Sequence, residues 1–243
     1  MTLTVEPLAL QGEIAAGADL AALVAAAAPP LEPGDVLVIA HKAVAKAEGR
    51  VVALAGVQPS AEAIEIAGDD GDPRQVELVL RESRRIVRRR GSLLIVETHH
   101  GFVCASAGID RSNTGGEDLA VLLPVDPDGS AQRLREGLRE RTGVAPAVVV
   151  ADTMGRPLRN GIVGKAIGCA GIAPIRGYQG AQDADGYTLR TTEVAVADEL
   201  AAAADLVMGK LERCPAALIR GHQPQGDGTA GELIRPVERD LFL

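Results

Sequence analysis

A short apolar run that changes abruptly into polar residues constrains this chain most. Residues 147–151 have the sequence AVVVA, which is typical of a strand buried on both faces. Asp152 and Thr153 follow at once, and a loop rich in glycine and arginine comes next. We expect the strand to end at Asp152. An acid and a hydroxyl there suit a hard divalent cation beside an anionic substrate, although either residue can equally cap a following helix.

The composition limits the classes of partner. The chain has 243 residues, of which 47% are hydrophobic, so it can bury a large core. Aromatic residues make up only 2%, which leaves no stacking platform for single-stranded nucleic acid. The net charge of -8 argues against binding to nucleic acid or to a membrane surface. A small anionic substrate would therefore need a local basic pocket within an acidic surface.

The cysteines and histidines predict neither disulfides nor a zinc site. Cys104, Cys169 and Cys214 are widely spaced and form no CxxC motif, as expected for reduced thiols of a cytoplasmic protein. The four histidines show no zinc-ligand spacing with these cysteines. The sequence has no signal-peptide pattern, and its apolar segments are too short or interrupted for a membrane span.

Two lysines follow a second buried strand. The strand is predicted over Val36–Ala40, and Lys42 and Lys46 come directly after it. On a helix these lysines share one face, and they lie where α/β folds bind ligands. The pair therefore suits phosphate binding, with two solvated surface lysines as the alternative.

A second acid occupies a context similar to that of Asp152. Asp110 follows an apolar strand predicted over Phe102–Ala107, and Ser112, Asn113 and glycines come after it. Two carboxylates that converge across a cleft can hold Mg²⁺ or Mn²⁺ against a nucleotide phosphate. The alternative for Asp110 is a residue that only forms a turn.

The remaining pattern predicts an α+β fold with mixed sheets and helices. There is no GxxxxGK[ST] loop and no GxGxxG after a strand, so we expect neither a P-loop nor a Rossmann motif. We expect a single domain over residues 1–243 with two intimately joined subdomains. The arginines of residues 81–90 are predicted to form a solvated helix face, with one arginine reaching an anionic ligand as the alternative. Helices are predicted over Asp19–Ala28, Gln75–Arg90, Ser130–Thr142 and Thr191–Met208, and a last strand over Ala216–Arg220.

Several segments together resemble a known family. They are GDVLVIAHKAVAKAEGRVV, AGIDRSN, LLPVDPDGSAQRLREGLRERTG, VVVADTMGRPLRNGIVGKAIGCAG and TTEVAVADELAAAADLVMGK. In this order, over about Leu3–Leu243, the chain resembles the coenzyme F420-0:L-glutamate ligase family, also called F420:gamma-glutamyl ligase. It resembles the single-domain form, which lacks a nitroreductase-like domain.

The resemblance implies an activity. Members of the family use GTP to join L-glutamate to the lactyl carboxylate of F420-0 through an acyl phosphate, and they can add further gamma-linked glutamates. Mg²⁺ or Mn²⁺, and often K⁺, are required. The family also implies a homodimer whose active site lies near the subunit contact, and symmetric dimers are the commonest oligomers in general.

The resemblance also assigns residues. It places the metal on Asp110, Asp152 and Thr153. Its GTP-contacting positions fall on Gln11, Gly12, Glu13, Ile14, His41, Lys46 and Asn113. Relatives often carry Ser in place of His41. Some relatives carry Gln at the position of Lys210 as a further metal ligand, and a lysine does not ligate a divalent cation readily.

The chemistry of phosphoryl transfer gives these residues roles. Asp110 and Asp152 would hold the metal, and Lys46 would stabilise charge on the phosphates. Arg156 and Arg159, with Lys165, are our candidates for binding the phosphodiester and carboxylates of the F420 precursor, because arginine suits such anions.

Two rival functions stay open. One is a ligase of the same architecture that acts on another carboxylate, and it would differ around residues 156–165. The other is a non-catalytic, GTP-binding regulatory protein.

Overall fold

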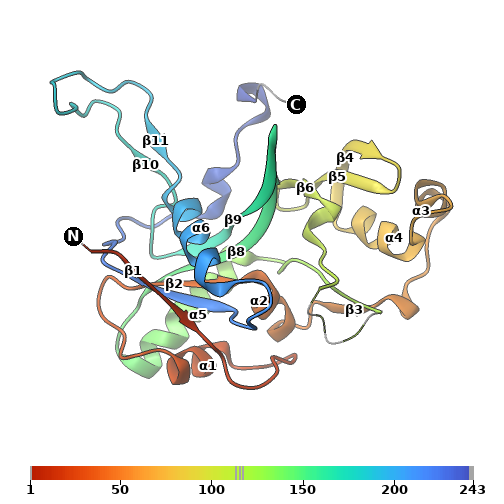
Figure 1. The fold of residues 1–243 in the computed structure, drawn as a ribbon, viewed down its shortest axis with the longest axis horizontal. Coiled ribbons are helices and arrows are strands. Elements are labelled where there is room, and N and C mark those ends of the chain that lie inside the picture. The colour runs from red at the N-terminus through yellow and green to blue at the C-terminus, as the bar shows by residue number, and fades with distance from the viewer. Residues whose placement is uncertain (1, 113, 115, 117, 241–243) are drawn as a thin grey trace.

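A five-stranded sheet forms the centre of the fold. The computed structural model describes residues 2–112, 114, 116 and 118–240. The strands follow the order β1 (Thr4–Leu8), β12 (Ala216–Arg220), β2 (Val36–Ala40), β8 (Ala147–Arg156) and β9 (Arg159–Ala170). Only the β2–β8 pair is parallel among these neighbours. The predicted α+β class is therefore confirmed (Figure 1).

Helices cover both faces of this sheet. Helices α1 (Leu20–Ala27) and α5 (Pro127–Thr142) pack on one face, and α6 (Val196–Met208) packs on the other. Because side chains alternate along a strand, Leu37 faces the first layer and Val38 the second. Burial on both faces explains why these strands are continuous apolar runs.

A smaller lobe lies beside the sheet and has a separate hydrophobic core (Figure 1). Its core includes Leu54, Ile66, Val79 and Leu94. The elements of the lobe are β3 (Val51–Ala53), α3 (Ala61–Ala67), α4 (Pro73–Arg81), β4 (Ser83–Arg90), β5 (Leu93–Thr98), β6 (Val103–Ala105) and β7 (Leu119–Val121). Helix α2 (His41–Ala47) contacts β2 and β8 on one side and β7 on the other, so it joins the two parts.

The remaining elements are short. They are β10 (Arg176–Gly177), β11 (Glu193–Val194) and the 3₁₀ helices Leu54–Gly56, Ser106–Gly108, Ala230–Leu233 and Val237–Arg239. Among the helices of the described chain, none combines the length and the apolar character that crossing a membrane requires.

The prediction of one helix over Gln75–Arg90 is wrong. Helix α4 ends at Arg81, and the arginine-rich segment is β4, an edge strand paired with β5. Arg85 Nε donates to Glu97 Oε2 at 2.7 Å across the pair. This pairing overrides the helix propensity of arginine, and charged side chains suit an edge strand.

The apolar strand of residues 147–151 was expected to end at Asp152, and this expectation is also wrong. Strand β8 continues to Arg156, because β9 pairs with it beyond the end of β2. The two strands form a projecting hairpin (Figure 1). At its tip Leu158 has a φ of 58° and is 91% exposed.

Two predicted helix starts are misplaced, whereas the predicted ends of the same helices, at Thr142 and Met208, are confirmed. Helix α5 begins at Pro127 with Asp126 as its N-cap, and Ser130 is buried inside the helix. The helix ends at Thr142 as predicted, because Gly143 is its left-handed C-cap. Helix α6 begins at Val196, later than the predicted start at Thr191.

Candidate functional site

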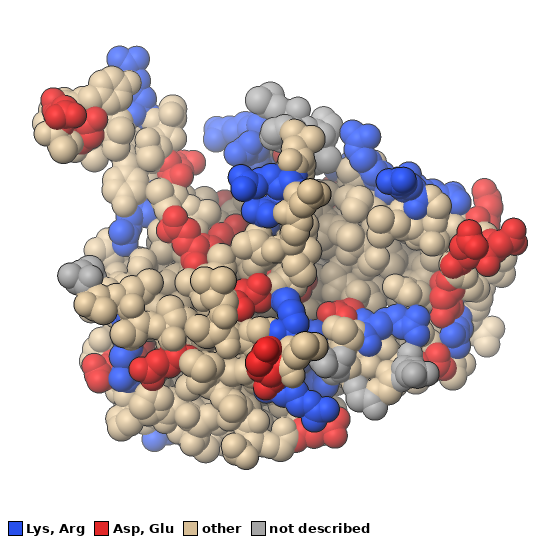
Figure 2. Space-filling model, in the orientation of Figure 1, with Lys and Arg blue, Asp and Glu red and all other residues tan. Residues whose placement is uncertain are grey.

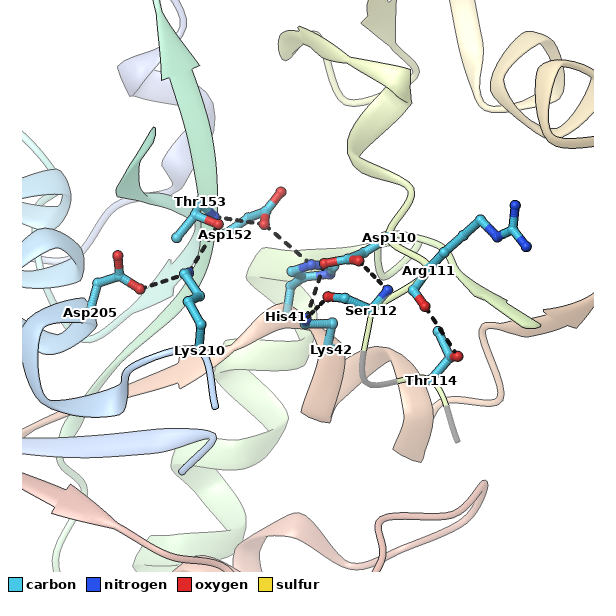
Figure 3. Close-up of polar contacts among 10 residues, drawn as sticks. All are labelled: His41, Lys42, Asp110, Arg111, Ser112, Thr114, Asp152, Thr153, Asp205 and Lys210. Carbon is cyan, nitrogen blue, oxygen red and sulfur yellow. Dashed lines mark hydrogen bonds and ion pairs between the residues drawn. The ribbon is translucent and has the colours of Figure 1, made fainter. Parts of the chain in front are cut away.

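The register between β2 and β8 brings a histidine against a predicted metal ligand. Ala40 lies opposite Ala151 in the parallel pair, so the residues that follow them, His41 and Asp152, are neighbours. His41 Nε2 lies 3.3 Å from Asp152 Oδ1, and the His41 side chain is only 2% exposed. Figure 3 shows the two side chains pointing toward one another. The end of a buried strand therefore places an imidazole beside a carboxylate.

Asp110 reaches the same helix from the smaller lobe. Its backbone is held by an antiparallel bridge to Val121. Lys42 Nζ donates to Asp110 Oδ2 at 3.0 Å, and the Ser112 backbone N–H donates to Oδ1 at 2.6 Å. Because Lys42 follows His41 directly, Asp110 and Asp152 both lie against the first turn of α2 (Figure 3).

The pKa values of Asp110 and of the nearby thiol of Cys104 are shifted by their surroundings. Burial raises the pKa of Asp110, but hydrogen bonds from Ser112 and Lys42 outweigh this effect and hold the pKa below its ordinary value. Asp110 is therefore ionised at neutral pH. Burial and, next, the negative charge of Asp152 raise the pKa of Cys104 to about 12, so that thiol stays protonated.

The third predicted metal ligand already contacts a cation of the protein. Lys210 Nζ donates to Thr153 Oγ1 at 3.2 Å and to Asp205 Oδ1 at 3.0 Å (Figure 3). The Thr153 backbone N–H also donates to Asp152 Oδ1 at 2.6 Å. An ammonium group therefore stands at this edge of the site.

A pocket of about 320 Å³ opens beside Lys46, in the part of α2 that follows its first turn. Its lining residues are Glu13, Ile14, Ala15, Ala16, Lys46, Gly49, Val51 and Thr114. It thus brings together three of the predicted GTP contacts, Glu13, Ile14 and Lys46. Lys46 lies about one turn beyond Lys42 on α2, so the pocket continues from the Asp110 side of the site. The volume is at the small end of the range for ligand pockets.

The other predicted GTP contacts have different placements. Gln11 and Gly12 lie earlier in the same loop and do not line the pocket. Gly12 has a φ of +81°, which the turn after β1 requires. Asn113 lies outside the described residues. Within the described chain, His41 Nδ1 is buried without a hydrogen-bond partner, as expected for a group that meets a ligand or water.

The donor set at the two acids fits a hard divalent cation. In the chain as described, no cluster of three or more His, Cys, Asp or Glu side chains is arranged for a metal. Mg²⁺, however, is usually held by one or two carboxylates together with substrate phosphates and water. Asp110 and Asp152 would supply the carboxylates of such a site, and Lys46 lies on the same helix as their partners Lys42 and His41.

The two arginines proposed for the substrate lie outside this cluster. Arg156 and Arg159 are paired at the tip of the hairpin, and Arg156 Nη2 donates to the Asn160 carbonyl at 2.8 Å. At about 3.3 Å per residue, Arg156 is about 13 Å along the strand from Asp152. Lys165 lies directly opposite Asp152 and is therefore the nearer of the proposed cations. Figure 2 shows Lys and Arg side chains around the projecting hairpin and over the smaller lobe.

Comparison with known proteins decides the family. A model of the F420-0:gamma-glutamyl ligase family matches residues 11–221. The chain belongs to this family. The matched range contains every described site residue discussed above, from Gln11 through Lys210. The predicted resemblance is thus confirmed.

Curated relatives agree along most of the chain. A protein of Methanothermobacter thermautotrophicus named coenzyme F420:L-glutamate ligase is 48% identical, with 94% of each chain covered. A protein of the same name from Methanopyrus kandleri is 45% identical, over 99% of this chain and 98% of its own. A third, from Methanocaldococcus jannaschii, is 44% identical over 88% and 86%. The chain is therefore a member of a ligase family of coenzyme F420 biosynthesis.

Besides the contact between His41 and Asp152, two ion pairs of this F420:gamma-glutamyl ligase family member were not predicted from the sequence. Lys42 was noted for phosphate binding, but its ion pair with Asp110 was not predicted. Asp205, which holds Lys210, carried no signal beyond its place near the end of a predicted helix. Both contacts join residues whose proximity depends on the packed fold.

Proposed function

We propose that this chain is a GTP-dependent ligase that joins L-glutamate to coenzyme F420-0 through an amide bond. The observation that carries the proposal is the arrangement on α2. Its first turn holds Asp152 and Asp110 through His41 and Lys42, and its next turn directs Lys46 to a pocket. The names of the relatives supply the substrate, since they are coenzyme F420:L-glutamate ligases.

GTP would lie along α2. The pocket at Glu13 and Ile14 would take the nucleoside part, and Lys46 would contact the phosphates. The terminal phosphates would then approach the first turn of α2. There the buried His41 ring, which has an unpartnered Nδ1 within the described chain, would donate a hydrogen bond to a phosphate oxygen.

Asp110 and Asp152 would hold Mg²⁺ or Mn²⁺ at this point. When bound, such an ion neutralises charge on the β- and γ-phosphates. Lys42 holds the Asp110 carboxylate in place through the 3.0 Å contact. From the family resemblance we also propose a requirement for K⁺, a homodimer with the site near the subunit contact, and the addition of further gamma-linked glutamates.

The reaction would proceed in two displacements. A carboxylate oxygen of F420-0 attacks the γ-phosphorus, and the bond from that phosphorus to the β–γ bridging oxygen breaks, releasing GDP and forming an acyl phosphate. The glutamate amine then attacks the acyl carbon, and inorganic phosphate leaves as the amine loses a proton. Lys46 stabilises the charge that moves onto the phosphate oxygens. Arg156, Arg159 and Lys165 would bind the phosphodiester and carboxylates of F420-0.

A product assay tests the proposal. The purified protein is incubated with F420-0, GTP, L-glutamate, Mg²⁺, Mn²⁺ and K⁺, and the masses of the products are determined by mass spectrometry. We expect F420 species heavier by one or more glutamyl residues, in step with GDP, and no such product after chelation with EDTA. GTP binding without any modified F420-0 would contradict the proposal and favour the regulatory alternative. Glutamate-dependent GDP release with another carboxylic acid only would favour the rival ligase.

A further inference from the structure

A lysine ammonium group contacts the third residue that was predicted to bind metal. Thr153 was predicted as a metal ligand, yet Lys210 Nζ lies 3.2 Å from its hydroxyl oxygen. The same Nζ is 3.0 Å from Asp205 Oδ1, so the ammonium bridges two oxygen atoms. Figure 3 shows this bridge beside Asp152, on the side away from Asp110.

The end of helix α6 fixes the position of Lys210. Asp205 lies in the last turns of α6, and Gly209 ends the helix with a φ of +61°. A side chain at Gly209 would meet the carboxylate of Glu212, which itself accepts a hydrogen bond from the Leu211 backbone N–H at 2.8 Å. The turn that starts at Gly209 therefore brings Lys210 back across Asp205 toward Thr153.

This geometry disfavours a second divalent ion at Thr153. The threonine hydroxyl carries no charge that would offset the Lys210 ammonium, whereas the Asp110 carboxylate offsets the charge of Lys42. Mg²⁺ binds its oxygen ligands at about 2.0–2.1 Å. An ion at that distance from the Thr153 hydroxyl would lie within a few ångströms of the Lys210 ammonium, and the two positive charges would repel each other. The Lys210 ammonium is favoured over a divalent ion at this position, because the Asp205 carboxylate balances its single positive charge.

We propose that Lys210 replaces one divalent cation, so that the site binds a single Mg²⁺ or Mn²⁺ between Asp110 and Asp152. This inference rests on the proposed function, because that function supplies the nucleotide and the first cation. The ammonium would contribute one positive charge next to the phosphates. Removal of the lysine opens the Thr153 hydroxyl to a second ion.

Counting bound Mn²⁺ tests this inference without turnover. Mn²⁺ is titrated into the full-length protein at saturating GTP, without F420-0 or glutamate, and free Mn²⁺ is followed by electron paramagnetic resonance. We expect one Mn²⁺ per chain in the wild type and two in Lys210→Gln, whose amide oxygen is a ligand. Lys210→Ala serves as a second variant, with two Mn²⁺ expected and the second bound more weakly.

A matched control shows whether the effect depends on the position of Lys210 or only on the loss of a positive charge. Arg213→Gln removes one positive charge from the same loop, and we expect it to keep a single Mn²⁺. Circular dichroism checks that each variant is folded. Two Mn²⁺ in the wild type, or one in both Lys210 variants, would overturn the inference while a positive product assay leaves the proposed function standing. Absence of any bound Mn²⁺ in the wild type would overturn both the inference and the metal site of the proposed function.

Discussion

Asp110 and Asp152 come from different lobes, yet they contact consecutive residues of one helix. Lys42 Nζ is 3.0 Å from Asp110 Oδ2, and His41 Nε2 is 3.3 Å from Asp152 Oδ1. The first turn of α2 therefore holds the two acids next to each other. Any shift of the smaller lobe against the central sheet would move one acid relative to the other.

Lys46→Gln tests the assignment of the pocket on α2. Loss of a charge-assisted contact to phosphate costs about 1.5–3 kcal/mol, so we expect KM for GTP to rise about tenfold to a hundredfold. KM for glutamate should stay within about twofold, because the pocket would bind only the nucleotide. Steady-state kinetics with each substrate varied in turn gives both values. A variant that changes KM for glutamate and leaves KM for GTP untouched would place Lys46 elsewhere.

Arg159→Ala tests the role of the hairpin tip. We expect KM for F420-0 to rise about five- to tenfold and KM for GTP to stay unchanged, because the arginine would contact an anion only in the bound precursor. Arg139→Ala, on the exposed side of α5, is the matched control and should match the wild type. The reverse pattern, with GTP affected, would assign Arg159 to the nucleotide.

Glu77→Gln tests how the smaller lobe is held together. Glu77 accepts hydrogen bonds from the Ser60 backbone N–H and from Arg81 Nε, each at 2.8 Å. Hydrogen bonds from Ser60 and then Arg81 lower the pKa of Glu77 from 4.5 to about 2. Because this folded-state pKa is depressed, the stabilisation is complete above about pH 4.5 and is lost as the pH falls toward 2.

The variant should therefore lose about 1–2 kcal/mol of unfolding free energy at pH 7, and the difference should shrink as the pH falls from 4.5 toward 2. Urea unfolding at pH 7 and pH 3 measures this difference. Glu62→Gln, at an exposed position of α3, is the control. A difference that stays constant between the two pH values would contradict the role assigned to the carboxylate.

Parts of the fold were predictable because their apolar runs are unambiguous. The strands at Val36–Ala40 and Ala216–Arg220 were predicted to the residue, since both are buried in the central sheet. The segment at Ser83–Arg90 was not, because it becomes a strand only through pairing with β5, and Glu97 lies too far along the chain to be recognised as its partner.

The same division applies to the site. Asp110 and Asp152 were proposed from the sequence because each follows an apolar segment, and Lys46 because it follows a buried strand. The contacts that organise them were not found, because the His41 contact depends on the register of β2 and β8. The Lys210 contact likewise depends on the turn after α6. Sequence patterns located the charged groups, whereas only the packed structure showed which groups contact each other.

A double-mutant cycle tests the shared role of the two acids most directly. The variants are Asp110→Asn, Asp152→Asn and the double variant, with Asp70→Asn at an exposed turn as the control. If both acids hold the same ion, each single variant should lower kcat at least about a hundredfold. The kcat of the double variant should then equal the kcat of the less active single variant, within about threefold. A double variant whose loss equals the product of the two single losses would contradict a shared ion.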